Sequence, residues 1–136
     1  MIYFDTNILI YYCIKQDETK QKISQKLIYQ AIGKNEFFIS PAVLMEFIFA
    51  ISKLKKFKEQ RDKVDFFKNF VNSSMSKNIV LSAYEKCQKF NKCRNINDFI
   101  HLEIADRYCD KLITFDSDFK NLEAFYDIEI EILGSY

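Results

Sequence analysis

The sequence is poor in the residues that shape tight turns. It contains two Gly and one Pro, and it has no Trp. So few turn residues argue against an all-β sandwich and favour a fold with many helices. The aromatic residues are instead 14 Phe and 8 Tyr, so we expect an aromatic-rich core.

Zinc ligands are also scarce. Cys13, Cys87, Cys93 and Cys109 show no CxxC spacing, and His101 is the single histidine. One His cannot complete a zinc set with cysteines spaced in this way. We therefore interpret most of the cysteines as buried thiols in a reducing compartment.

Long apolar runs and strong net charge are absent too. No segment reaches the roughly 18 to 20 continuous apolar residues of a membrane span, and the N-terminus lacks the basic n-region of a signal peptide. We expect a cytoplasmic protein with no membrane partner. At 136 residues, 49% of them hydrophobic, residues 1–136 are expected to form one domain. The net charge of +1 says little about partners.

Strand and helix patterns alternate along the chain. Strands are expected at residues 2–5, 36–40, 79–81, 111–115 and 128–133, and helices at 8–14, 23–33, about 41–51, 58–72, 82–90 and 98–109. Gly33 is expected to end the second helix, and Ser82 with Glu85 to cap the fifth. The Ile-Glu alternation in 128–133 suggests an edge strand. This order indicates an α/β fold with a mostly parallel, helix-covered sheet.

Four acids occupy unusual positions. Asp5 and Asp116 each follow an apolar strand, where open α/β sheets place their sites. Glu46 is the only polar residue between Ala42 and Ile51, with no Lys or Arg within one helical turn, and Asp98 opens an apolar-periodic stretch. Carboxylates beside apolar runs are costly unless something positive meets them. We interpret the four as one acidic, metal-binding pocket.

Each acid also has a structural interpretation, and the residues alone leave both open. Asp5 and Asp98 stand where helix N-caps would, and Asp116-Ser117-Asp118 fits a surface Asx-turn. Glu46 needs either a cation or a metal. A capping carboxylate keeps free lone pairs, so capping and metal binding are compatible.

The carboxylates of such a pocket repel one another unless a divalent ion offsets their charge. Oxygen-only ligation favours Mg²⁺ or Mn²⁺, and these ions suit phosphodiester hydrolysis. Hydroxyl and amide side chains beside the acids are expected to orient ligands or water; they are Thr6, Asn7, Ser40 and Thr114. His101 follows Asp98 by three residues, although a lone His is more often structural and metal-activated water needs no histidine base.

At these positions the chain resembles the PIN-domain family over nearly its whole length. Four short segments carry the resemblance, in order: Asp5-Thr6-Asn7, Ser40 with Glu46, residues 98–105 opened by Asp98, and residues 114–119 around Asp116. One departure is the loop Asn91–Arg94, which lacks the Gly common there in relatives.

The resemblance implies a Rossmann-like α/β/α sandwich with a mostly parallel central sheet of 4–5 strands, and Mg²⁺- or Mn²⁺-dependent endoribonuclease activity. Asp5, Glu46, Asp98 and Asp116 are the implied catalytic and metal-binding residues, with Asp118 as an alternative fourth ligand. Compact PIN proteins are most like VapC-type toxins, which are usually dimeric, cut structured RNA and are neutralised by a small antitoxin.

Other functions remain open. One is a PIN-like module that binds nucleic acid or protein without cutting, although it would have no reason to keep a self-repelling acid cluster. Another is a PIN nuclease of RNA processing that has no antitoxin. For an RNA-cutting enzyme we expect phosphate contacts from Lys92 and Arg94, in the loop before Asp98. An antitoxin is expected to carry a basic or Arg-bearing tail for the acidic pocket.

Overall fold

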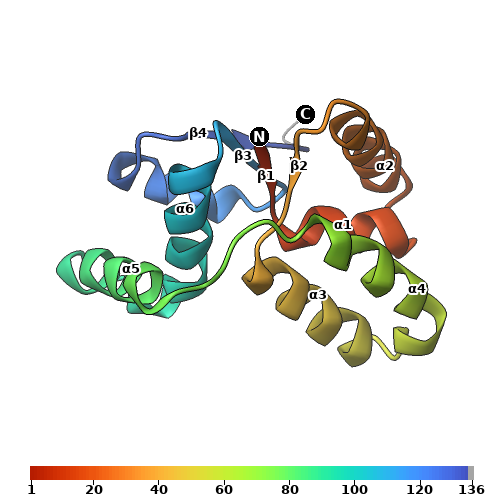
Figure 1. The fold of residues 1–136 in the computed structure, drawn as a ribbon, viewed down its shortest axis with the longest axis horizontal. Helices are drawn as coiled ribbons and strands as arrows, with labels where there is room; N and C mark the ends of the chain where they lie inside the picture. The colour runs from red at the N-terminus through yellow and green to blue at the C-terminus, as the bar shows by residue number, and fades with distance from the viewer. Residues whose placement is uncertain (135–136) are drawn as a thin grey trace.

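Short strands alternate with longer helices along the chain (Figure 1). The structure is a computed structural model that describes residues 1–134; the expected domain runs to residue 136, so its last two residues lie outside the described part. The elements, with η for 3₁₀ helices, are β1 (Ile2–Phe4), α1 (Thr6–Cys13), α2 (Glu18–Gly33), β2 (Phe37–Phe38), α3 (Pro41–Lys53), α4 (Phe57–Phe67), η1 (Lys68–Phe70), α5 (Lys77–Lys89), η2 (Cys93–Asn95), α6 (Ile96–Tyr108), β3 (Lys111–Thr114), η3 (Ser117–Phe125) and β4 (Glu129–Ile132).

The strands form one parallel sheet in the order β2-β1-β3-β4. β1 lies inside it, where Ile2 pairs with Phe37 of β2 and with Lys111 of β3. The carboxyl ends of the strands therefore meet at one edge. This arrangement confirms the expected α/β, PIN-like fold. β4 is an edge strand, and its alternately exposed and half-buried residues agree with the Ile-Glu pattern.

The helices form two groups with the strands between them (Figure 1). α5 packs against α6 on one side, while α1 packs against both α2 and α3, and α3 against α4, on the other. α3 also contacts α6, which brings the two groups together below the carboxyl edge of the sheet. Within residues 1–134, every helix is too short or too polar to cross a membrane.

The core is rich in aromatic side chains, as the composition predicted. Phe67 of α4 is fully buried and lies 5.4 Å from Phe47, 5.6 Å from Tyr12 and 6.1 Å from Phe37, measured between ring centroids. Such aromatic pairs contribute roughly 0.5–1.5 kcal/mol each beyond the area they bury. The cluster fixes α1, α3 and α4 against β2, and so it fixes the helix that carries Glu46.

The expected strand at 79–81 is wrong, because these residues lie in α5. Ile79, Ala83 and Cys87 are buried at helical spacing, and this burial outweighs the β-propensity of the apolar triplet. The expected cap at Ser82 with Glu85 is wrong for the same reason. Ser76 caps α5 instead, since its hydroxyl accepts a hydrogen bond from the amide of Ile79.

α2 ends at Gly33, as expected, although the left-handed residue that follows the helix is Asn35 (φ 56°), and the Glu36 amide donates to Ala31 O. Two other expected helix ends differ. α6 begins at Ile96, so Asp98 lies in its first turn and is not the N-cap. The helix expected at 58–72 ends at Phe67 and continues as a 3₁₀ turn.

Candidate metal centre

Side chains from the sheet edge and from α1, α3 and α6 line one cleft of about 290 Å³. Asp5 follows β1, and Asp116 comes two residues after the end of β3. Glu46 reaches the cleft from α3, and Asp98 and His101 reach it from α6. The four acids that the sequence singled out therefore lie on the wall of a single cleft.

Asp5 is the most firmly held of the four. It is buried and caps α1, with its Oδ1 accepting from the Thr6 amide at 2.7 Å. Its Oδ2 accepts from the Thr114 hydroxyl at 2.6 Å and from the Asn7 side-chain amide at 3.2 Å. Both structural and functional interpretations of Asp5 are thus compatible, because the cap fixes the carboxylate at the cleft.

Thr114 and Asn7 connect the ends of β1 and β3. The Thr114 hydroxyl accepts from the Asn7 side chain at 3.1 Å and from the Asp116 amide at 3.0 Å. The Asn7 side-chain oxygen accepts from the Phe115 amide at 3.2 Å. These bonds orient the chain around Asp5 and Asp116, as expected for residues that support a site.

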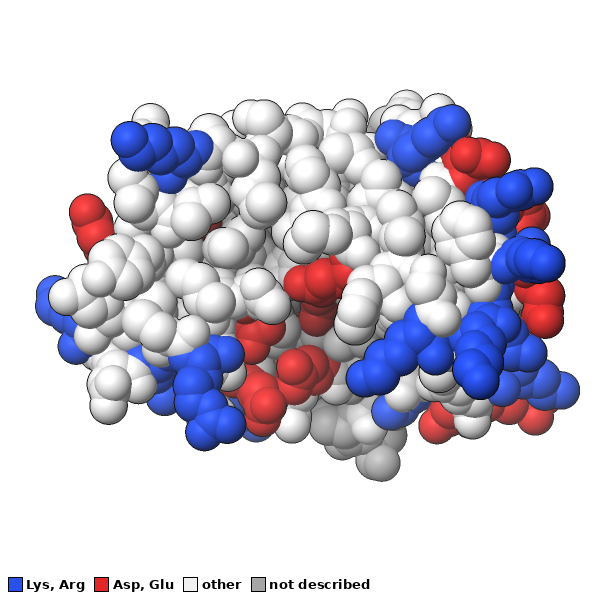
Figure 2. All heavy atoms as spheres, turned by 90° about the horizontal axis from the view of Figure 1, so that it is seen from below, with Lys and Arg blue, Asp and Glu red and all other residues white. Residues whose placement is uncertain are grey.

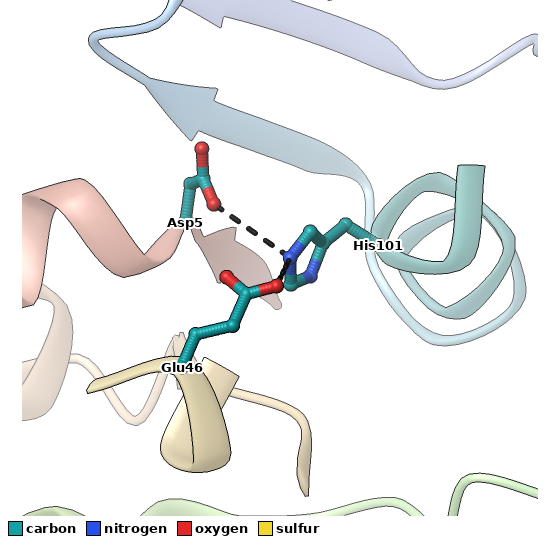
Figure 3. Close-up of side chains that lie close together, drawn as sticks. All are labelled: Asp5, Glu46 and His101. Atoms are coloured by element: carbon teal, nitrogen blue, oxygen red, sulfur yellow. Dashed lines mark hydrogen bonds and ion pairs between the residues drawn. The ribbon is translucent and has the colours of Figure 1, made fainter. Parts of the chain in front are cut away.

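Glu46 pairs with two side chains of the protein itself, His101 and Thr6. Its Oε1 lies 2.9 Å from Nε2 of His101, and its Oε2 accepts from the Thr6 hydroxyl at 2.6 Å (Figure 3). Nε2 of His101 is also 4.0 Å from Oδ1 of Asp5. The sequence placed no Lys or Arg near Glu46; its partner is an imidazole on another helix, and Glu46 raises the pKa of that imidazole.

His101 belongs to a buried chain of hydrogen bonds. Its Nδ1 lies 2.6 Å from the Tyr3 hydroxyl, which in turn lies 2.6 Å from the Ser40 hydroxyl. Ser40 caps α3, accepting from the amide of Val43 at 3.2 Å. Both ring nitrogens are therefore occupied, and the chain links the N-terminus of α3 to Glu46 on the same helix.

The two remaining acids are more accessible. Asp98 is half-buried in the first turn of α6, and Asp116 is half-buried after β3. Asp116 Oδ1 accepts from the amide of Asp118 at 2.9 Å, which is the expected Asx-turn. Asp118 itself is exposed and is not among the residues that line the cleft. Of the two alternatives, the cleft contains Asp116.

Burial and neighbouring charges shift the pKa values of these groups. Burial raises the pKa of Asp5 above its ordinary value, although His101 and the bonds from Thr114 and Thr6 oppose it. Burial likewise raises the pKa of Asp98 to about 6. For Glu46, burial also acts upward, but the bonds with His101 and Thr6 outweigh it and lower the pKa. His101 shows the reverse balance: burial lowers its pKa, and Glu46, Asp5 and Asp98 together raise it.

These residues fit a hard divalent cation. One donor atom each of Asp5, Glu46 and His101 lies within 4.8 Å of the others, which is a group the sequence prediction did not include. Since Nε2 of His101 faces Glu46, the donors left for a cation are carboxylate oxygens. The raised pKa values of Asp5 and Asp98 indicate negative charge that the protein only partly compensates. Oxygen donors with uncompensated charge suit Mg²⁺ or Mn²⁺.

Tyr3 and His101 are site residues that the sequence interpretation missed or set aside. A signal for each was present. Tyr3 precedes Asp5 by two positions in a strand, so both side chains point to the same face. His101 follows Asp98 by three positions in a helix, which also places them on one face. The lone histidine is thus structural in its contacts and still part of the site.

Basic side chains flank the acidic centre. Figure 2 shows carboxylates gathered in the middle of one face, with Lys and Arg on both sides of them. Arg94 is exposed in η2, and Lys92 is half-buried just before it. Both belong to the segment that leads into α6 and Asp98. Their contact with RNA stays a prediction.

Comparisons with known proteins agree with this architecture. A chain in the crystal structure of VapBC2 from Rickettsia felis, bound to a DNA fragment from their promoter, superposes with a TM-score of 0.66 at 23% identity over 98% of this chain and 100% of that one. FitAcB from Neisseria gonorrhoeae gives 0.65 at 17% identity over 96% of each chain. FitAB bound to an IR36 DNA fragment gives 0.64 at 14% identity, over 96% of this chain and 93% of that one.

The sequence comparisons are more specific about family. No match was found among curated protein sequences. The family model described as PIN domain matches residues 2–124, which contain all four acids of the cleft. The chain therefore belongs to the PIN domain family.

Proposed function

We propose that this protein is a Mg²⁺- or Mn²⁺-dependent endoribonuclease and the toxin of a toxin–antitoxin pair. PIN domains are generally nucleases, and the observation that carries the proposal is the convergence of Asp5, Glu46, Asp98 and Asp116 on one cleft. The VapBC and FitAB structures that resemble this chain support the toxin assignment. The structured RNA of the cell would be the substrate, and the cytoplasm the place of action.

The four carboxylates would hold the metal, which would supply an activated water and offset charge on the phosphate. The protein's own residues would do the positioning. Thr6, Asn7 and Thr114 hold the carboxylate of Asp5 in place. His101 would keep Glu46 ionised and oriented toward the cleft, and Ser40 would act through Tyr3 to fix the imidazole.

Cleavage of a susceptible RNA tests the activity. Purified protein should cut it with Mg²⁺ or Mn²⁺ and stop when EDTA is added. Asp5→Asn and Asp98→Asn should each abolish cleavage, whereas Asp106→Asn, an exposed acid on the same α6, should leave it intact. Wild-type cleavage by Asp5→Asn or Asp98→Asn would refute the assigned mechanism. Metal-dependent RNA binding without any cleavage would favour the non-catalytic module.

Lys92 and Arg94 would position RNA through its phosphates rather than choose its sequence. Their replacement by Ala should weaken binding broadly and flatten the dependence of affinity on salt. Lys26→Ala, which removes an exposed charge from α2, is the matched control. The slope of log affinity against log salt would be compared for the wild type, the variant that lacks Lys92 and Arg94, and Lys26→Ala. If the three slopes are equal, the segment before α6 is not part of the RNA-binding surface.

The antitoxin would bind the acidic cleft through a basic side chain. A guanidinium can bind two carboxylate oxygens at once, so an Arg or Lys from a basic tail would sit among the acids and exclude metal. Full inhibition by an antitoxin whose tail has lost every basic residue would require another blocking mode. A small upstream gene that encodes a DNA-binding fold with a basic tail would separate a toxin from a PIN nuclease of RNA processing.

A further inference from the structure

Two cysteines meet where α5 turns toward α6. Cys87, in the last turn of α5, is fully buried, whereas Cys93, the first residue of η2, is exposed. Their Sγ atoms are 2.7 Å apart. The interpretation of the cysteines as buried thiols therefore fails for Cys93, which is an accessible thiol in contact with a buried one.

The local backbone produces this contact. α5 ends with Asn91 in the left-handed conformation (φ 54°), and the chain folds back so that the Lys92 amide donates to Cys87 O at 2.7 Å. The Asn91 amide donates to Gln88 O at 3.1 Å. This is the hydrogen-bond pattern of a Schellman motif, and it places Cys93 directly over Cys87 despite the lack of CxxC spacing.

We propose that Cys87 and Cys93 form a reversible disulfide, with a low-molecular-weight disulfide as the oxidant. The exposed Cys93 thiolate attacks one sulfur of the oxidant and releases one thiol, which leaves Cys93 in a mixed disulfide. The Cys87 sulfur then attacks Cys93 and releases the second thiol. The protein loses two protons and two electrons in total, and both end on the two thiols released from the oxidant.

The surroundings of the two thiols determine which of them attacks the oxidant first. Burial, together with the contact to Cys93, raises the pKa of the Cys87 thiol to about 11, so Cys87 is a poor first nucleophile. Once Cys93 carries the mixed disulfide, its contribution to that shift is gone. An accessible attacking thiol beside a resolving one is the arrangement of redox-responsive cysteines.

The bond would clamp the segment that leads into the metal centre. Phe90 in the enclosed turn stacks on Phe125 at 4.2 Å between ring centroids, and Asn95 of η2 lies three residues before Asp98, which lines the cleft. Because the two sulfurs already touch, oxidation should preserve this conformation and rigidify it. This inference concerns thiol chemistry and does not rest on the proposed ribonuclease activity.

Glutathione disulfide is the probe for the full-length protein. After oxidation, alkylation and mass spectrometry should find Cys13 and Cys109 modified and a Cys87–Cys93 disulfide in the same chain. The melting temperature should rise by on the order of 5 °C, and amide hydrogen exchange across residues 88–95 should slow. Dithiothreitol should reverse all three changes.

Cys93→Ser should show none of these changes, while Cys109→Ser, which alters a half-buried thiol elsewhere, should behave as wild type. Three outcomes would overturn the proposal: both thiols remain open to alkylation after oxidation, a stable mixed disulfide persists on Cys93, or Cys93 links two chains instead. Each is readable even if the protein proves to cleave no RNA.

Discussion

At the scale of single residues, His101 decides how the cleft tolerates its acids. Among the side chains that line the cleft, it is the one able to carry a positive charge. It lies 2.9 Å from Glu46 and 4.0 Å from Asp5, and burial removes water that would otherwise screen these charges. Burial raises the pKa of Asp98 to about 6, and His101 opposes this rise only in part.

Asp98→Asn should therefore stabilise the metal-free protein at pH 7. A carboxylate whose folded pKa is raised to about 6 binds its proton more tightly in the folded state, so its ionisation lowers the unfolding free energy as pH rises from about 4 to 6. After allowance for solvent screening, removal of this charge should add about 1 kcal/mol, or roughly 4 °C. Thermal melts in EDTA at pH 7 would measure it.

The same comparison at pH 4 should show a smaller difference, because Asp98 is then protonated in the folded protein and about half protonated in the unfolded chain. Saturating Mg²⁺ should stabilise the wild type by about 1–3 kcal/mol, and Asp98→Asn should lose most of that gain. Asp106→Asn on the exposed side of α6 serves as the matched control. A lower melting temperature for Asp98→Asn in EDTA, with equal Mg²⁺ shifts in both proteins, would mean that the acids do not act together.

Tyr3→Phe tests the buried hydrogen-bond chain. The change removes one hydroxyl that contacts both Ser40 and His101 at 2.6 Å, so Nδ1 of His101 loses its partner and Ser40 keeps only the bond from the Val43 amide. Unfolding free energy in urea should fall by about 1–3 kcal/mol. Tyr29→Phe, at a side chain that is 81% exposed, should change it by less than about 0.5 kcal/mol. Equal stability of Tyr3→Phe and wild type would show that the chain of bonds contributes nothing.

At the scale of elements, the scarcity of glycine has a visible consequence. Three helices end with a non-glycine residue in the left-handed conformation: Asn35 after α2, Lys55 after α3 and Asn91 after α5. Asn adopts this conformation more readily than most residues, whereas the β-carbon of Lys meets a steric penalty there. The loop before Asp98, which lacks the glycine common in relatives, uses Asn91 for the same turn.

Lys55→Gly should therefore stabilise the protein by about 1 kcal/mol, since Gly carries no β-carbon. The Schellman bonds at this turn, from Lys56 N to Ile51 O and from Lys55 N to Ser52 O, are made by the backbone and survive the change. The same substitution at Lys26, exposed in the middle of α2, should cost about 1 kcal/mol. Denaturant midpoints that move in the same direction for both variants would contradict this account.

The sequence predicted element type well where periodicity and burial agreed. Strands at the start, at 111–115 and at 128–133 were recovered because short apolar runs ended in polar turns or alternated with Glu. The strand at 79–81 was wrong because the β-branched Ile79 and Val80 have high β-propensity and Leu81 extends the apolar run, while only Ile79 is buried. Local propensity alone could not reveal which of the three would face the core.

At the scale of the whole molecule, charge and apolar surface are separated. The acidic centre occupies the hollow of one face with basic side chains at both margins, and much of the area between carries no charge (Figure 2). Met45 and Phe49 stand exposed one turn apart on α3, and Leu81 and Tyr84 are exposed on α5. The resemblance to VapC-type toxins, which are usually dimeric, predicts a homodimer, and we propose that a second copy of the chain covers these exposed side chains of α3 and α5.

Phe49→Asp should consequently dissociate the dimer. Phe49 is 67% exposed, so the change should place a charge in the interface without disturbing the core of one subunit. Light scattering coupled to size exclusion should give a dimer for wild type and a monomer for the variant at the same concentration. Tyr29→Asp, on the exposed face of α2, should remain dimeric. A wild type that is monomeric at micromolar concentration would refute the dimer.

The sequence predicted the acids of the cleft and the neighbouring Thr6, Asn7 and Thr114, but not the contacts that Tyr3 and His101 make there. Asp5, Glu46, Asp98 and Asp116 were recognisable because each interrupts an apolar pattern. The His101–Glu46 contact joins α6 to α3, and the bond between Tyr3 and His101 joins β1 to α6. Such pairs depend on how distant elements pack, which no spacing in a single sequence reports.

The central position of β1 also sets when the sheet can be completed during synthesis of the protein. β1 leaves the ribosome well before its partner β3, and the Asp5 amide reaches its acceptor, Ile113 O, only when both are present. At about 5–20 residues per second, translation needs roughly 5–20 s to supply that partner. A nascent chain that ends before β3 lacks Asp116 and the strand that pairs with β1 on one side. Such a chain cannot assemble the acidic cleft, so under the proposed function the toxin would stay inactive while it is being made.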